Sequence, residues 1–93
     1  MIIGSISVKL YAPWVHSLKE KRMIVKSITS KIRNKFNVSI SEIDEQDTHK
    51  TIVIGICLVT TETSYANSVL DKVLDFIEFN TEANIVESKI EII

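Results

Sequence analysis

The sequence predicts an α+β domain in which a four-stranded antiparallel sheet carries two helices on one face. Three observations predict it: four segments have strand-like patterning, two have helical spacing, and their order is strand, helix, strand, strand, helix, strand. Right-handed crossovers applied to both strand–helix–strand units place the two helices on the same side of the sheet. The chain has 93 residues, of which 45% are hydrophobic and 25% charged, as in a small globular protein. We therefore expect a single domain over residues 1–93.

The first strand and the first helix are marked by different periodicities. Residues 2–11 alternate between two faces, which predicts a half-buried strand. Ser17, followed three residues later by Glu20, forms a capping box that predicts a helix near residues 18–36. Its apolar side chains fall within a stripe about 120° wide; they are Leu18, Ile24, Val25, Ile28, Ile32 and Phe36. Lys21 also falls inside this stripe, so its ammonium is expected either to extend past the end of the sheet or to enter a pocket there.

The middle of the chain predicts a β-hairpin. Residues 38–43 form its first strand, with a bulge near Glu42 that restores the facing of the side chains. The polar run 44–50 is the loop, and residues 51–60 are β-branched and apolar on both faces, which is typical of a central strand. Within this strand, Cys57 is expected to be a small buried hydrophobic residue.

The last third of the chain predicts a second helix near residues 64–79 and a fourth strand over residues 84–92. Either Thr61 or Thr63 can cap the helix. The residues expected to face the sheet recur at helical spacing; they are Tyr65, Val69, Val73, Phe76 and Ile77. The completed order, βαββαβ, is that of the ferredoxin-like sandwich.

Charge is strongly segregated along the chain. Seven of the eleven basic residues lie between residues 19 and 35, where Glu20 is the only acid, so this segment has a net charge of +6. The remainder carries −7, and the total is −1. A nearly neutral sum therefore hides a focused positive face, which is the surface that an anionic partner would meet.

The candidate binding residues lie on the first helix. A helical wheel places Lys19, Arg22, Lys26 and Arg33 on one flank, which we call the basic flank, with Lys21 near the helix start as a fifth candidate. Acids for i,i+4 ion pairs are almost absent, and cations in the first turns oppose the helix dipole. Such departures from local preference favour phosphate or nucleic-acid binding. The alternative is that these charges are only a solvated helix face.

The loop before this helix contains two further candidates. Trp14 and His16 can stack on a base or contact a phosphate beside the basic flank. The favoured interpretation of Trp14 is structural, as a plug at the open end of the core. His49, in the predicted hairpin loop, has no second histidine or cysteine at metal-ligand spacing, so no metal site is expected.

Several chemistries known for this architecture lack their residues here. RNA-recognition domains carry aromatic residues on the first and third strands, but residues 3–10 and 52–59 contain none. A metallochaperone would need a cysteine pair after the first strand, and an acylphosphatase-like enzyme would need a glycine-rich anion loop; residues 12–16 provide neither. No catalytic triad is recognisable. We expect a non-enzymatic protein without a cofactor.

The cellular compartment follows from what the sequence lacks. A single cysteine excludes an internal disulfide and is typical of a reducing environment. No apolar run approaches the roughly 20 residues of a membrane span, and no secretory signal precedes the first strand. A cytoplasmic protein without membrane association is expected.

Two runs resemble the signature of the YlxP-like bacterial family, domain of unknown function 503. They are Ser17-Leu18-Lys19-Glu20-Lys21-Arg22 and Arg33-Asn34-Lys35-Phe36-Asn37-Val38-Ser39-Ile40-Ser41-Glu42-Ile43. Gln46-Asp47 and residues 69–74 are also similar, so the resemblance spans nearly the whole chain. It implies a small single-domain protein with a ferredoxin-like fold and no established activity. It also implies a gene position, in many bacteria, beside translation initiation factor two and ribosome-binding factor A. Members often carry a tryptophan and further basic residues where Thr48-His49-Lys50-Thr51 stands here.

Two functional hypotheses result. The first is an accessory module that binds RNA or the ribosome through the basic flank. The second is a homodimer or other protein-interaction module that uses the helix-free face of the sheet or an edge strand. The apolar residues expected on that face are Ile3, Tyr11, Val53, Cys57 and Val59. Salt dependence distinguishes the two, because phosphate binding weakens steeply with salt and apolar association does not.

Overall fold

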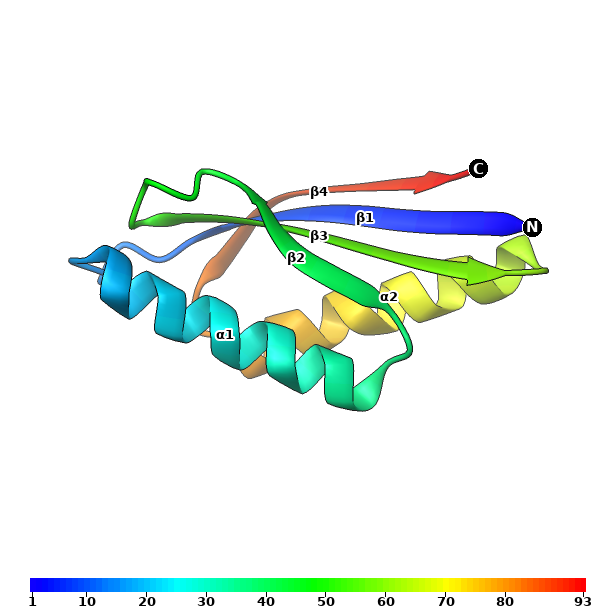
Figure 1. Ribbon diagram of the computed structural model, residues 1–93, viewed down its shortest axis with the longest axis horizontal. Coiled ribbons are helices and arrows are strands. Elements are labelled where there is room, and N and C mark those ends of the chain that lie inside the picture. Colours follow the sequence, from blue (N-terminus) through cyan, green and yellow to red (C-terminus); the bar gives the residue numbers. More distant parts are fainter.

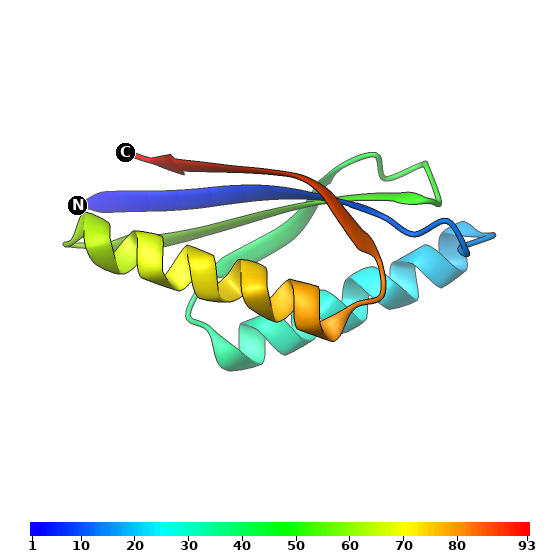
Figure 2. The same ribbon diagram turned by 180° about the vertical axis from the view of Figure 1, so that it is seen from behind.

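The computed structural model describes residues 1–93 and contains six elements in the predicted order (Figure 1). They are β1 (Ile2–Tyr11), α1 (Leu18–Lys35), β2 (Ser39–Asp44), β3 (Thr51–Thr60), α2 (Thr63–Asn80) and β4 (Asn84–Ile92). The sheet order is β2-β3-β1-β4, and every neighbouring pair is antiparallel. Both helices lie on the same face of the sheet (Figures 1 and 2). The predicted α+β sandwich is therefore confirmed.

The core lies between the sheet and the two helices. On β1 the even-numbered residues face the helices, and Ile6 and Val8 pair across the ladder with Ile56 and Ile54 of β3. All four side chains are at least 98% buried. Each such side chain contributes about 1.5–3 kcal/mol through removal of apolar surface from water. The alternation in the sequence thus translates directly into a one-sided core.

Helix α1 begins where the capping box predicts. The Ser17 hydroxyl accepts the Glu20 backbone N–H at 3.1 Å, which satisfies one of the unpaired amides of the first turn. The helix ends at Phe36, whose extended backbone breaks the pattern while its N–H still donates to Ile32. The predicted N-cap at Ser17 is confirmed, and of the two hydrogen bonds of a capping box the structure contains the one that Ser17 accepts.

Helix α2 begins differently from the prediction. Its N-cap is Glu62, and neither Thr61 nor Thr63 forms a side-chain cap. The Thr60 hydroxyl accepts the Glu62 N–H at 3.4 Å, just before the helix. The predicted threonine caps are therefore wrong, because Thr61 lies one residue before the N-cap and Thr63 is already the first helical residue.

The buried stripe of α2 is also shifted from the predicted one. Tyr65 is 57% exposed, and Ala66 and Leu70 are fully buried together with Val73. The reason lies on β1, where Gly4 has no side chain: a Cβ placed there would be 3.0 Å from the Ala66 Cβ. A small residue must face this glycine, so the helix presents Ala66 to the sheet rather than the neighbouring tyrosine.

The β2–β3 hairpin contains the predicted bulge. The register shifts between Glu42 and Asp44, and the extra residue, Ile43, covers Gly55 on the helix-free face. Cys57 lies on the same face and is exposed. The expectation of a buried cysteine is wrong, because only the even-numbered residues of β3 face the helices and no layer covers the other side.

Candidate nucleic-acid interface

The basic flank is present on the surface of α1. Lys19, Arg22, Lys26 and Arg33 are all exposed. The Arg33 guanidinium donates to the Ile40 carbonyl of β2 at 2.9 Å, which places the flank on the side of α1 nearest to β2. The sequence therefore predicted correctly that these four residues share one side of the helix.

No acid neutralises the basic flank. The protein has two ion pairs, Lys21–Glu42 and Lys89–Glu91, and neither involves a residue of the flank. The side chains of Lys19, Arg22 and Lys26 also form no hydrogen bond. Their charges are consequently available to an external anion.

Lys21 does not belong to this exposed surface. Its side chain is 1% exposed, and its ammonium lies 2.9 Å from the Glu42 carboxylate. The same ammonium donates to the Thr48 carbonyl at 2.6 Å and to the Glu45 carbonyl. A lysine has three N–H donors, so the three acceptors occupy them all. Of the two expected placements, the ammonium enters the pocket, and it has no donor left for a phosphate.

These contacts hold the β2–β3 loop against the start of α1, at one end of the molecule (Figure 1). Glu45 has a φ of 57°, a left-handed conformation that costs about 1–2 kcal/mol for a residue with a Cβ. Its N–H donates to the Asp44 carboxylate at 2.8 Å, and its own carboxylate accepts the Thr48 hydroxyl at 2.8 Å. The Lys21 ammonium completes this network and offsets the strain of the turn.

A second lysine, Lys50 of the hairpin loop, holds the neighbouring loop between β1 and α1. The Lys50 ammonium, at the end of the hairpin loop, donates to the Pro13 carbonyl at 2.5 Å and the Val15 carbonyl at 3.1 Å. The Lys50 carbonyl accepts the Ala12 N–H at 2.8 Å. Each of the two loops is thus held by a lysine from outside it. Sequence reasoning missed this role because Lys50 appeared as part of a polar loop.

Replacing Lys50 by methionine is expected to lower the free energy of unfolding by about 1.5 kcal/mol, since two carbonyls lose a charged donor. The Trp14 loop should loosen as well, which would shift the tryptophan emission to longer wavelength. Urea unfolding and fluorescence of the folded protein measure the two effects. Lys72→Met, at an exposed position of α2, is the control. Unchanged stability and emission in Lys50→Met would contradict the assigned role.

Trp14 and His16 are not brought next to the basic flank. Trp14 is 42% exposed and lies against Met23 and Ile24, in a groove of about 300 Å³ between α1 and the end of α2. This is the side of α1 opposite the basic flank. His16 is exposed in the same loop. The interpretation of Trp14 as the core plug is wrong, because Val15, which is fully buried, closes this end.

An aromatic groove that the sequence did not indicate lies between the C-terminal halves of the helices. Phe36 and Phe76 meet edge to face at 5.7 Å, and the Lys35 ammonium is 5.0 Å from the centre of the Phe76 ring. Phe79, which is 89% exposed, also lines this hollow of about 400 Å³, together with the polar residues Lys72, Asp75 and Asn80. In the sequence, Phe79 falls outside the apolar stripe of α2. A large aromatic residue at a position expected to be exposed was the signal that could have indicated this groove.

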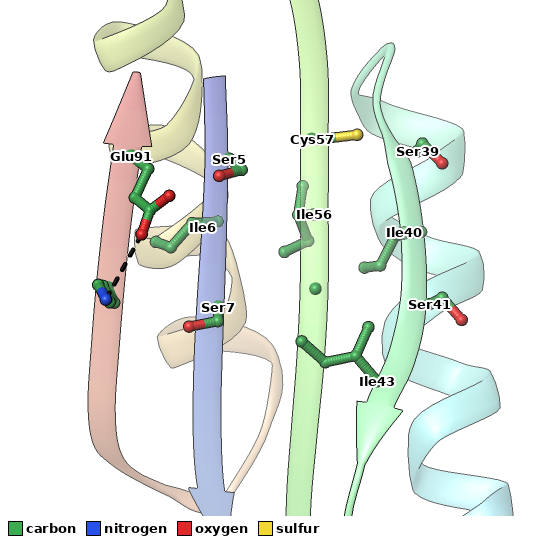
Figure 3. A pocket seen from close by; sticks show the side chains of 12 residues that line it. Ser5, Ile6, Ser7, Ser39, Ile40, Ser41, Ile43, Ile56, Cys57 and Glu91 are labelled. Atoms are coloured by element: carbon green, nitrogen blue, oxygen red, sulfur yellow. Dashed lines mark ion pairs between the residues drawn. The ribbon is translucent and has the colours of Figure 1, made fainter. Parts of the chain in front are cut away.

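The helix-free face of the sheet combines small polar side chains with exposed aliphatic ones. Its centre is a hollow of about 430 Å³ (Figure 3). The small residues that line it are Ser5, Ser7, Ser39, Ser41, Gly55 and Cys57. They separate Ile3 and Val59, which pair at one end, from Val53 and Tyr11 toward the other. Ile43, which lies over Gly55, adds an exposed aliphatic side chain in the middle of this face.

No three His, Cys, Asp or Glu side chains are placed to hold a metal ion. Neither α1 nor α2 has the length and apolar character that a membrane-spanning helix requires.

Comparisons with known proteins identify relatives and structural neighbours. Residues 3–90 match the family described as "Protein of unknown function (DUF503)". The chain is 47% identical over 62 residues, 67% of each chain, to the "Uncharacterized protein YlxP" of Bacillus subtilis (strain 168).

Two designed proteins share the fold. A de novo designed protein with ferredoxin fold, LFR1 1, has a TM-score of 0.57 and 16% identity, and the match covers 98% of this chain and 86% of that one. The de novo designed protein Foldit4 has a TM-score of 0.52 and 10% identity, covering 99% and 94%. Similarity at this level of identity concerns the fold alone.

Proposed function

We propose that this chain, which belongs to the DUF503 family of proteins of unknown function, is a non-catalytic accessory module for structured RNA. It binds the phosphates of RNA, such as ribosomal RNA, through the basic flank of α1. The observation that carries the proposal is the row of exposed cations on α1 without an acidic partner. Cytoplasmic localisation is part of the proposal, since ribosomal RNA is found there.

The position of the cations on α1 supports a functional role over simple solvation. Lys19 lies in the first turn, where the helix dipole makes a cation unfavourable by about 0.3–1 kcal/mol, and Arg22 follows in the second turn, where the effect is smaller. No intrahelical ion pair offsets this cost. Lys21, which lies between them in the sequence, is buried and paired with Glu42, so it adds no charge to this surface. Unpaired cations at these positions lower the stability of the isolated domain. Their presence is explained if a bound anion neutralises them.

The dimensions of the basic flank suit a nucleic-acid backbone. From Lys19 to Arg33 the helix rises about 21 Å, at 1.5 Å per residue. Four cations spread over that length can reach several phosphates, and the helix presents them in one direction. The guanidinium of Arg33 retains donors beyond the one used for Ile40. The flank thus offers up to four phosphate contacts.

Binding by this surface should tolerate many sequences. Base recognition needs side chains that reach base edges or stack on unpaired bases. Trp14 lies on the opposite side of α1, and no amide or aromatic side chain shares the basic flank. The geometry therefore supports recognition of the RNA backbone rather than of its sequence.

The test replaces Lys19, Arg22 and Lys26 together by glutamine and measures affinity for ribosomal RNA at several salt concentrations. The slope of log affinity against log salt should flatten by about 0.7–0.9 per lost contact, or about 2–3 in total. Stability should stay equal or rise slightly, because cations near the positive end of the dipole are removed. Urea unfolding measures that effect separately.

A matched control removes the same charge elsewhere. Lys9, Lys31 and Lys72 lie on the sheet, on another side of α1 and on α2, and their glutamine variant has the same net charge as the test variant. It should bind RNA nearly as the unmodified protein does. Equal affinities and slopes for the two triple variants would mean that the basic flank is only solvated surface.

A further inference from the structure

Helix α2 carries a second, largely apolar stripe outside the core, and we propose that this stripe is the docking site for a basic amphipathic helix of a partner protein. It lies on the side of α2 that faces α1. Its members, which we call the lateral stripe, are Tyr65, Val69, Lys72, Phe76 and Phe79. The inference is independent of RNA binding, because the basic flank lies on the other side of α1.

The lateral stripe exposes large aromatic side chains. Phe79 is almost fully exposed and Tyr65 is more than half exposed, while Val69 and Phe76 are partly buried. Single exposed apolar residues are common on protein surfaces, but a contiguous row of them marks an interaction site. Aromatic residues are also among those that most often carry the binding energy of an interface. The lateral stripe is therefore a contact surface that folding of the chain leaves incompletely covered.

The spacing of the lateral stripe favours a helix as the partner. Its members are separated by four, three, four and three residues, which is the heptad spacing of helices that pack side by side. On a helical wheel they fall within about 80°, and the buried residues of α2 form a separate stripe centred about 110° away. From Tyr65 to Phe79 the helix rises about 21 Å, at 1.5 Å per residue. A partner helix of about four turns would cover this length.

The fold leaves room for such a helix beside α2. α1 accompanies only the C-terminal half of α2, where Phe36 and Phe76 meet edge to face. The N-terminal half of α2, with Tyr65 and Val69, extends beyond the end of α1 (Figures 1 and 2). At the other end of the stripe, the hollow of about 400 Å³ beside Phe79 can receive side chains of the partner. An amphipathic helix that lays its apolar face into a groove is a common mode of recognition.

Acidic residues along the outer edge of the lateral stripe indicate the charge of the partner. Asp75 lies directly beside the stripe, and Asp71 and Glu78 lie one row further out on the helical wheel. All three are exposed, and none forms an ion pair. Asp71 and Asp75 repel each other at i,i+4, and Glu78 in the last turn opposes the helix dipole. These unfavourable charges are neutralised if the partner helix has a basic edge.

The cations near the lateral stripe do not cancel this preference. The Lys35 ammonium, on the α1 side, already contacts the Phe76 ring at 5.0 Å from its centre. Lys72, in the middle of the stripe, forms no ion pair. Its long stem can lie against apolar surface while its ammonium stays in water. Three unpaired carboxylates therefore face the partner together with one unpaired ammonium, and a basic helix is the complementary ligand.

Other occupants fit the lateral stripe less well. The stripe is symmetric about Lys72, so a two-fold pair of α2 helices would bring two Lys72 ammoniums and two acidic rows together. α1, the basic helix of the chain, already buries its apolar side in the core. RNA that stacked a base on Phe79 would bring its phosphates close to Asp75 and Glu78. The partner is therefore a separate protein with a basic amphipathic helix.

The test uses two synthetic helices of about four turns with leucine at the heptad seam, one with lysine and one with glutamate at the flanking positions. Anisotropy of the labelled peptides measures affinity, and amide NMR shifts locate the site. The lysine helix should bind about tenfold more tightly than the glutamate helix, with shifts concentrated on α2. Phe79→Ser should weaken binding about tenfold, because an aromatic contact is lost. Val59→Ser, on the helix-free face, is the control and should have little effect.

Charge reversal gives an independent variant. Replacing Asp71, Asp75 and Glu78 together by lysine should leave the circular dichroism spectrum unchanged, since all three are exposed and cations suit this end of α2. The variant should prefer the glutamate helix. The proposal is overturned if the lysine helix does not bind at millimolar concentration, if Phe79→Ser leaves its affinity unchanged, or if charge reversal leaves the preference unchanged. A wild-type dimer that Phe79→Ser dissociates would assign the lateral stripe to a second copy and overturn it as well.

Discussion

Replacing Lys21 by alanine is expected to lower the free energy of unfolding by about 3 kcal/mol or more. The substitution leaves the Glu42 carboxylate without its counter-ion, and that carboxylate oxygen is buried and contacts no other donor. The Glu45 and Thr48 carbonyls lose a donor at the same time. In urea, the midpoint of unfolding should fall while the dependence on urea stays unchanged.

Two further variants separate the cause of this loss. Lys21→Met/Glu42→Leu removes both charges, so it should be less destabilising than Lys21→Ala despite changing two residues. The loss that remains belongs to the two loop carbonyls. Lys19→Ala, at an exposed neighbouring position, should change stability by less than about 0.5 kcal/mol. A Lys21→Ala protein as stable as the wild type would show that the buried lysine contributes nothing to folding.

The fold was predictable because its signals are local. Alternation over residues 2–11 and the helix start at Ser17 each depend on neighbours within a few residues, and both appear in the structure as expected. The bulge beside Glu42 was readable from the break in alternation alone. Topology then followed from crossover handedness, which does not depend on particular side chains.

The errors concern contacts between residues that are distant in the sequence. The buried position of Lys21 was predictable from the helical wheel, but its acceptors lie 24 and 27 residues away in the hairpin loop. Lys50 and the Trp14 loop are separated similarly. Cys57 was placed correctly on the helix-free face but was expected to be buried, whereas no layer covers this face of the sheet and the residue is exposed.

The shifted stripe of α2 has the same kind of origin. Apolar spacing alone grouped Tyr65 with Val69 and Val73, four and eight residues later, whereas Ala66 lies about 100° away on the helical wheel and was left out of the stripe. The choice is made by Gly4, some sixty residues earlier, where the absence of a side chain lets α2 approach β1. A substitution at Gly4 therefore tests why α2 turns Ala66, rather than Tyr65, toward the sheet.

Substituting valine for Gly4 is expected to destabilise the protein by about 2–3 kcal/mol. A Cβ at this position would lie 3.0 Å from the Ala66 Cβ and 3.3 Å from the Leu70 Cδ1. Both of those side chains are fully buried, so relief requires α2 to move away from the sheet. Urea unfolding measures the loss.

Gly55 provides the matched comparison. A Cβ there would lie 2.8 Å from Ile43 Cγ2, which is closer, yet Ile43 is 51% exposed and its side chain can rotate into solvent. Gly55→Val should therefore cost less than Gly4→Val, even though its initial contact is tighter. Gly4→Ala combined with Ala66→Gly should also be less destabilising than the sum of the two single changes, since the second removes the atom that the first approaches. Additive single effects, or a larger loss at Gly55, would mean that the close approach of α2 to β1 does not determine how this helix packs.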